Sequence, residues 1–215
     1  MNNSLENLTR HPPPSLNIAV VVLDGFDFAS LSSILEAISS AKRNIGSEKI
    51  SVSTIGIHSP LASSLGIKIV PNLALTDVQL SEFHVTILIG GSAAKLTTHS
   101  ELSLQLIDAD KSGRLMGGVW NGAYHLAAAG LTAGYECLIT GDGRFAIEPT
   151  LEKRKRHCAW HFDERRMTSG DSHSTTCMMN AMIVHYFQAC NDALQSIQDA
   201  GPQDMNEGLS FPEAC

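Results

Sequence analysis

The segment that most resembles a functional site is Gly118-Val-Trp-Asn-Gly122, which separates a short apolar run from a helix of small residues. Small residues on both sides of a central position are typical of a nucleophile elbow, a sharp strand-to-helix turn that projects one side chain from a strained backbone. The central residue is Trp120, whose indole has no nucleophilic heteroatom. The same spacing also fits an ordinary strand-to-helix turn packed through glycine.

Two features of this region could serve ligand binding rather than covalent chemistry. Gly90-Gly91-Ser92 follows an apolar run, and its backbone N–H groups could face a carboxylate or phosphate. The Trp120 ring could stack on a flat or cationic ligand, or it could itself fill the pocket, and both possibilities remain open. An enzyme with a displaced nucleophile would use Cys137 or Ser92, although Cys137 falls in a predicted strand.

Histidine and cysteine donors occur at two spacings that a metal could use, His157-Cys158-x-x-His161 and His173-x-x-x-Cys177. The second pair lies on a predicted core helix, where cysteine behaves as a small apolar residue. We therefore predict neither a metal site nor a cofactor. The basic run at residues 153–157 is predicted to be a solvated helix face rather than a phosphate site.

The distribution of charge limits the classes of partner. The 215 residues carry a net charge of −7, and no Lys or Arg follows Arg166. Because phosphate contacts need a basic surface, we expect no DNA-reading module at the C-terminal end and no direct nucleic-acid binding. Neither a signal peptide nor an apolar run long enough to cross a bilayer is present, so we expect a cytoplasmic protein with reduced cysteines.

The order of apolar patterns predicts alternating strands and helices. The expected strands are 16–23, 50–57, 67–70, 85–89, 114–119 and a short one near 167–168. The expected helices are 28–44, 100–110 with Ser100 as N-cap, 121–129 and 172–199, with a basic, partly helical stretch over 151–166. We expect Met178, Met179, Met182 and Ile183 to be core or dimer-interface residues.

Alternation of this kind predicts an α/β fold with a mostly parallel sheet between two layers of helices. Ligands bind such sheets at the carboxyl ends of the strands, which here are the turns after residues 23, 89 and 119. We expect one domain over 16–200, preceded by a flexible arm at 1–15 and followed by an acidic tail at 201–215.

Several blocks of the sequence are similar to one family. LNIAVVVLDGFDFASLSSILEAISSAKR, VTILIGG, GGVWNGAYHLAAAGLTAGYEC and RRMTSGDSHSTTCMMNAMIVHYF resemble, in order, the class I glutamine-amidotransferase-like (PfpI-like) domain of AraC-family transcriptional regulators. The resemblance covers about residues 16–190. It implies a flavodoxin-like three-layer sandwich, often dimeric, that senses a small metabolite while attached helix-turn-helix units bind DNA.

The chain departs from the catalytic members of that family at three positions. Trp120 stands where they have the elbow cysteine, Ser30 aligns with their acidic partner, and Thr140 or Gly141 aligns with their histidine. Hydrolysis by the family's route is therefore not expected, because nucleophile, acid and base are all missing. The sequence also stops at Cys215, where the regulators continue into their helix-turn-helix units.

These observations together predict a non-catalytic, homodimeric sensor that binds a small metabolite, such as an amino-acid or quaternary-amine derivative, or a partner protein. A structural dimer without a ligand is the remaining alternative. The candidate ligand-binding residues are Gly25, Asp27, Gly91, Ser92, Trp120, Asn121 and Thr140.

Overall fold

The computed structural model describes residues 14–91, 94, 96–140, 145–147 and 160–200. Its centre is a seven-stranded sheet in the order β10-β11-β7-β6-β1-β2-β5, parallel except for the β10–β11 pair. The strands are β1 (Leu16–Val22), β2 (Ile50–Gly56), β5 (Leu73–Ala74), β6 (Val85–Ile89), β7 (Leu115–Val119), β10 (Trp160–Asp163) and β11 (Arg166–Ser169).

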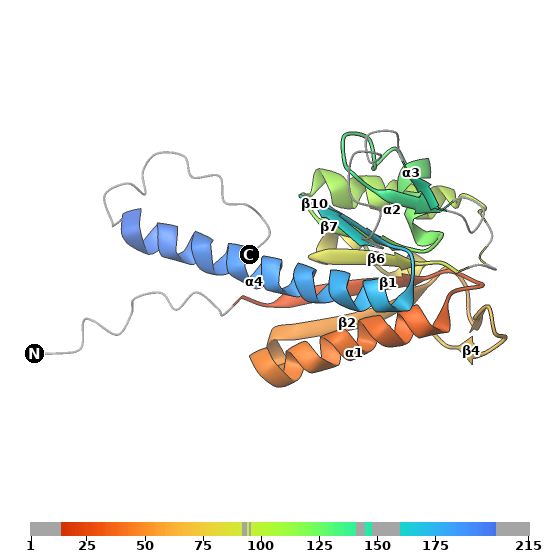
Figure 1. Ribbon diagram of the computed structural model, residues 1–215, viewed down its shortest axis with the longest axis horizontal. Helices are drawn as coiled ribbons and strands as arrows, with labels where there is room; N and C mark the ends of the chain where they lie inside the picture. The colour runs from red at the N-terminus through yellow and green to blue at the C-terminus, as the bar shows by residue number, and fades with distance from the viewer. Residues whose placement is uncertain (1–13, 92–93, 95, 141–144, 148–159, 201–215) are drawn as a thin grey trace, which may run out of the picture.

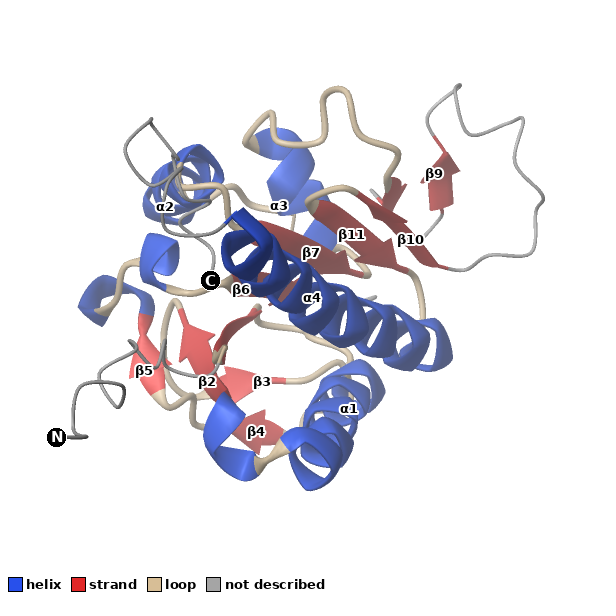
Figure 2. Cartoon of the chain, turned by 90° about the vertical axis from the view of Figure 1, so that its left-hand side faces the viewer, coloured by secondary structure: helices blue, strands red, loops and turns tan. Residues whose placement is uncertain are grey.

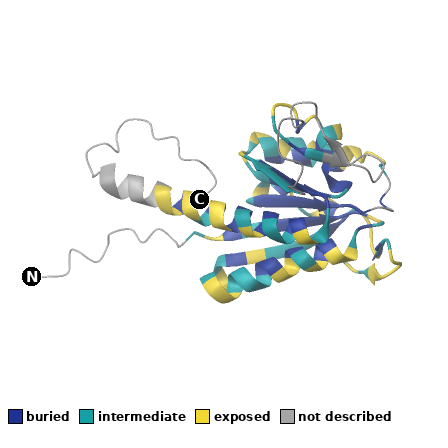
Figure 3. Cartoon of the chain, viewed as in Figure 1, coloured by how far each residue is buried: buried dark blue, intermediate teal, exposed yellow. Residues whose placement is uncertain are grey.

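Two helices cover each face of the sheet (Figures 1 and 2). One face carries α1 (Phe28–Ile45) and α4 (Ser172–Ala200), and the other carries α2 (Ser100–Lys111) and α3 (Gly122–Ala128). This is the predicted flavodoxin-like α/β sandwich, and the sheet lies between the two apolar cores (Figure 3).

The innermost strands form because their sequences are apolar at every position. All five side chains of β6 are buried, and six of the seven in β1 are. Strands covered on both faces need such continuous runs, and β-branched residues suit them. The register pairs Ile18 of β1 with Val85 of β6, so the carboxyl ends of both strands reach the same edge. The predicted strands at 16–23 and 85–89 are confirmed.

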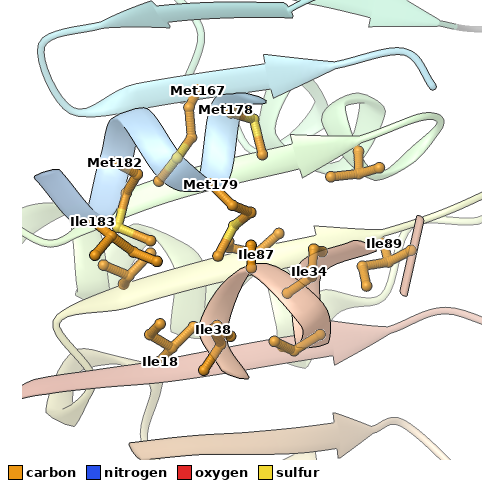
Figure 4. Close-up of a cluster of buried hydrophobic side chains, with 14 of the residues drawn as sticks. Ile18, Ile34, Ile38, Ile87, Ile89, Met167, Met178, Met179, Met182 and Ile183 are labelled. Atoms are coloured by element: carbon orange, nitrogen blue, oxygen red, sulfur yellow. The ribbon is translucent and has the colours of Figure 1, made fainter. Parts of the chain in front are cut away.

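Most of the core on the α1–α4 face consists of aliphatic and methionine side chains (Figure 4). The four residues predicted to be core or dimer-interface residues are all buried within the single chain, which supports the first of these alternatives: Met178, Met179, Met182 and Ile183 of α4. They pack against a cluster that includes Ile34 of α1. Unbranched, flexible methionines fill the irregular space between a helix and a twisted sheet.

Some local expectations differ from the structure. α2 begins at Ser100 itself, and the residue at its N-cap is His99, which makes no side-chain capping bond. The described part of the stretch expected to be partly helical, residues 160–166, lies in a β-hairpin, because β10 pairs antiparallel with β11. Two small hairpins were not predicted in full: β3 (Leu61–Ala62) with β4 (Lys68–Ile69), and β8 (Leu138–Thr140) with β9 (Phe145–Ile147).

Several expectations concern residues outside the described part of the chain. These are residues 1–13 of the N-terminal arm, Ser92, Gly141, the basic run 153–157, Cys158 and the tail 201–215.

Candidate functional site

The turn between β7 and α3 has the strained geometry expected from its glycine spacing. Trp120 adopts a φ of 52°, in the left-handed region that L-residues with a bulky side chain avoid. Such a conformation costs about 1–2 kcal/mol and persists only where its surroundings enforce it. The Trp120 backbone N–H donates to the Ser169 carbonyl at 2.9 Å, which ties the turn to the end of β11.

The indole is hydrogen-bonded to the first turn of α1. Its Nε1–H donates to Ser30 Oγ at 3.2 Å, and Ser30 Oγ in turn donates to Asp27 Oδ2 at 2.7 Å. The same carboxylate oxygen accepts the Ser30 backbone N–H at 2.8 Å, so Asp27 is the N-cap of the helix. Ser30 is fully buried and Trp120 is partly buried. Ser30, which the resemblance aligns with an acidic partner, therefore contacts the elbow residue directly.

The turns after β1 and β6 meet the elbow at the same edge of the sheet. Asn121 Nδ2 donates to the Gly91 carbonyl at 3.0 Å, and the Asp27 N–H donates to the Gly90 carbonyl at 2.9 Å. A Cβ on Gly91 would lie 2.5 Å from the Gly25 carbonyl oxygen, so the backbones approach as closely as glycine permits.

Five of the seven candidate residues thus lie together at this edge, joined by hydrogen bonds, by the bridge through Ser30 or by close backbone approach: Gly25, Asp27, Gly91, Trp120 and Asn121. Ser92 lies outside the described residues. The backbone of Thr140 belongs to β8, in the small separate hairpin, and its side chain is among those not described.

A second polar cluster at this edge was missed by sequence reasoning. Ser169 at the end of β11 and Thr175 in the first turn of α4 are buried, and their hydroxyl oxygens lie 2.7 Å apart. Thr175 Oγ1 donates to the Asp171 carbonyl at 2.6 Å, so the hydrogen between the two hydroxyls must come from Ser169. The sequence pattern that could have revealed this cluster is Asp171-x-x-Ser174, which is typical of a helix N-terminus. Asp171 caps α4 by accepting the Ser174 N–H at 2.7 Å.

Cys137 is unsuited to act as a displaced nucleophile. It precedes β8 rather than lying within a strand, and its side chain is fully buried. A reactive thiol needs access to substrate as well as an environment that lowers its pKa.

Two of the three histidines singled out as metal donors, His161 and His173, lie in the described part of the chain. His161 Nε2 lies 3.1 Å from Glu136 Oε2, and His173 lies on α4. Within the described residues, no group of three or more His, Cys, Asp or Glu side chains could hold a metal ion.

Burial of two histidines predicts loss of stability in mild acid. Burial, with a smaller contribution from His99, lowers the pKa of His125, and burial, assisted by Arg114, lowers the pKa of His84. The neutral forms are therefore favoured in the folded chain. The resulting stability is fully present above the ordinary histidine pKa of 6.5 and is lost as the pH falls toward the lowered folded values.

Urea unfolding at pH 5 to 8 measures this effect. His125 is the sharper probe, because its buried Nε2 has no hydrogen-bond partner among the residues that the structure describes. We expect His125→Leu to flatten the acid limb of the stability curve. An unchanged limb in that variant would show that His125 does not contribute.

The comparisons with known proteins agree with this fold and place the chain in a family. The model of the DJ-1/PfpI family matches residues 17–160. The chain belongs to the DJ-1/PfpI family. No helix in the described part of this family member is long and apolar enough to cross a membrane.

The similar proteins include transcriptional regulators. The HTH-type transcriptional regulator GbdR of Pseudomonas aeruginosa is 25% identical over 177 residues, which cover 80% of this chain and 48% of the regulator. The chain thus spans about half the length of the curated relatives it matches. The crystal structure of an AraC family transcriptional regulator from Pseudomonas putida superposes with a TM-score of 0.67 at 21% identity, covering 85% of this chain and 99% of that one.

A further structural neighbour is the oxidized DJ-1 of Toxoplasma gondii, with a TM-score of 0.63 at 16% identity over 85% of this chain and 98% of that one. At these identities the structural likeness establishes the DJ-1/PfpI fold alone.

Proposed function

We propose that this DJ-1/PfpI domain is a regulatory sensor that binds a small metabolite without converting it. The observation that carries the proposal is the elbow itself. A strained turn holds an indole, and that indole is hydrogen-bonded to Ser30, at the two positions where resemblance to catalytic relatives places a cysteine and its acidic partner. The similarity to GbdR and to an AraC family regulator supports a regulatory role.

Neither side chain can perform the chemistry of the missing groups. An indole forms no acyl or thioester intermediate, and a serine hydroxyl does not exchange protons near neutral pH as a carboxylate or imidazole does. Trp120 and Ser30 instead offer an aromatic face and a hydroxyl, which bind ligands without reacting with them.

The chemistry around the elbow favours a small ligand with a cationic or flat group. The Trp120 ring can attract a cation to its face, and the Asp27 carboxylate lies two hydrogen bonds away through Ser30. Amino-acid and quaternary-amine derivatives have this chemistry. With a net charge of −7, the chain would act in the cytoplasm through a partner or a further domain rather than by holding DNA itself.

Tryptophan fluorescence tests this function, because the chain has two tryptophans, Trp120 and Trp160. Replacing Trp160 by phenylalanine leaves Trp120 as the single reporter, and Trp120→Phe gives the matched control. We expect titration with quaternary amines, amino acids and their derivatives to shift the emission of the Trp160→Phe variant and not that of the control. A flat titration, with calorimetry also flat, would contradict the proposal.

A screen for amidase and glyoxalase turnover tests the non-catalytic part of the proposal. We expect no turnover above the uncatalysed rate. Turnover that disappears in Cys137→Ser would show that the chain is an enzyme with a displaced nucleophile.

We also propose that the domain forms a homodimer. Several large apolar side chains are exposed in the single chain, and Leu65, at 77% exposed in the β3–β4 hairpin, is among the most accessible. Exposed apolar groups of this size recover free energy when a second surface covers them. Sedimentation should show a dimer that Leu65→Glu weakens. Leu104→Glu on α2, at a residue that is 67% exposed, is the matched control and should leave the dimer intact.

A further inference from the structure

Trp120 is hydrogen-bonded directly to the beginning of α1 and, through Ser169 at the end of β11, is linked to the beginning of α4. Its side chain donates to Ser30 in the first turn of α1, and its backbone N–H donates to Ser169, the residue that bridges to Thr175 in the first turn of α4. These contacts join segments that are far apart in the sequence: Trp120 and Ser30 are 90 residues apart. A displacement of the elbow would therefore disturb both helices.

The two helices form one packed unit. α1 and α4 lie side by side on the same face of the sheet (Figures 1 and 2), and they share the core that contains Ile34 and Met179. The opposite face has its own core under α2 and α3. In Figure 1, α4 continues past the edge of the sheet, on the side away from the elbow. The helix thus connects the candidate site to a distant part of the molecular surface.

We propose that α4 is the output element of this sensor: a ligand that displaces the Trp120 indole changes the hydrogen bonds at the first turns of α1 and α4, and α4 carries the change along its length. The inference rests on the proposed sensor function. It assigns the regulatory response to the α1–α4 face. Helix α2, on the other face, is expected not to respond and serves as the internal control.

The physical basis is the burial of the hydroxyls. Ser30 is fully buried, so its Oγ has little water to replace an indole N–H that moves away. Ser169 and Thr175 are no more than 2% exposed, so little water can replace their hydroxyl bridge when the Ser169 backbone follows the Trp120 N–H that it accepts. Such a group must find another partner, which requires its backbone to shift. The strained backbone at Trp120 favours this response, because moving the indole allows the turn to relax.

Hydrogen exchange tests the inference without any ligand. Trp120→Gly removes the indole and permits the positive φ, and we expect amide exchange in the first turns of α1 and α4 to quicken about fivefold, the effect of roughly one buried hydrogen bond. Exchange in α2 should change less than twofold. Unchanged exchange in α4, or an equal increase in α2, would overturn the inference.

Thr175→Val isolates the bridge between Ser169 and α4. In a chain that already carries Thr175→Val, Trp120→Gly should no longer raise the amide exchange rate in the first turn of α4. It should still raise the exchange rate in the first turn of α1. Thr176→Val is the matched control, because Thr176 Oγ1 bonds to the Ser172 carbonyl within α4 itself. If the Thr175 and Thr176 variants behave alike, the bridge does not carry the signal.

A reciprocal measurement covers the case in which Trp120→Gly does not fold. Coupling between two sites acts in both directions, so Thr175→Val should shift the Trp120 emission of the Trp160→Phe chain and Thr176→Val should not. Equal emission in both variants would overturn the inference. Failure of the ligand titrations alone would remove the sensor function, whereas these exchange and emission results report on the coupling itself.

Discussion

Replacing Asp110 by alanine is expected to lower the free energy of unfolding by about 3 kcal/mol, because the change leaves a buried charge without its partner. Arg166 is 1% exposed, and its guanidinium donates to Asp110 Oδ1 at 2.5 Å and to the Leu131 carbonyl at 2.6 Å. The same guanidinium lies 4.6 Å above the centre of the Tyr135 ring. Urea denaturation of the purified variant measures the loss.

Glu36→Ala provides the control for this prediction. It breaks the pair between Glu36 and Arg43 on α1, whose side chains are 72% and 61% exposed. Exposed pairs contribute little because water solvates both charges, so the change should stay within about 0.5 kcal/mol. Equal effects of Asp110→Ala and Glu36→Ala would mean that the buried guanidinium is stabilised by its carbonyl and ring contacts alone.

The second large effect is expected at Gly122, the first residue of α3. A Cβ there would fall closer than 3.0 Å to the carbonyl group of Leu88 in β6. Backbone atoms of a central strand cannot rotate aside as a side chain can, so Gly122→Ala should destabilise the fold by about 3 kcal/mol or more. The helix would be pushed away from the sheet, and Asn121 would lose its bond to Gly91.

Gly113→Ala separates this clash from backbone strain. Gly113 has a φ of 74°, but a Cβ there would meet no atom within 4 Å. Its expected loss is therefore about 1 kcal/mol, the strain of a left-handed alanine. The denaturation midpoints of Gly122→Ala and Gly113→Ala test this prediction. If Gly122→Ala is as stable as Gly113→Ala, α3 can move away from β6 without a further loss of stability.

Local patterns in the sequence were sufficient for most of the fold. The continuous apolar runs at 16–23 and 85–89 can be buried only as central strands, and the helical spacing after Asp27 leads to α1. Of the β10–β11 hairpin, the short strand near 167–168 was predicted, but β10 was missed because it is short and none of its four side chains is fully buried, so it lacks a strong periodic signal.

The site was predictable in part for the same reason. Gly118 and Gly122 each lie two residues from Trp120, so the turn can be recognised from neighbouring residues. The turns that follow parallel strands lie at the same edge of a sheet. Gly25, Asp27, Gly91 and Asn121 accordingly lie beside the elbow.

The sequence alone determined that this chain forms a parallel α/β sandwich and that an indole stands at its strand-to-helix turn, because both depend on neighbouring residues. Only the tertiary structure decided that this indole bonds to Ser30 and that Ser169 joins the turn to Thr175. It also decided that Asp110 compensates the charge of Arg166. A hydrogen bond between residues 90 positions apart has no periodicity to reveal it, since its partners meet only after the sheet has brought their strands together.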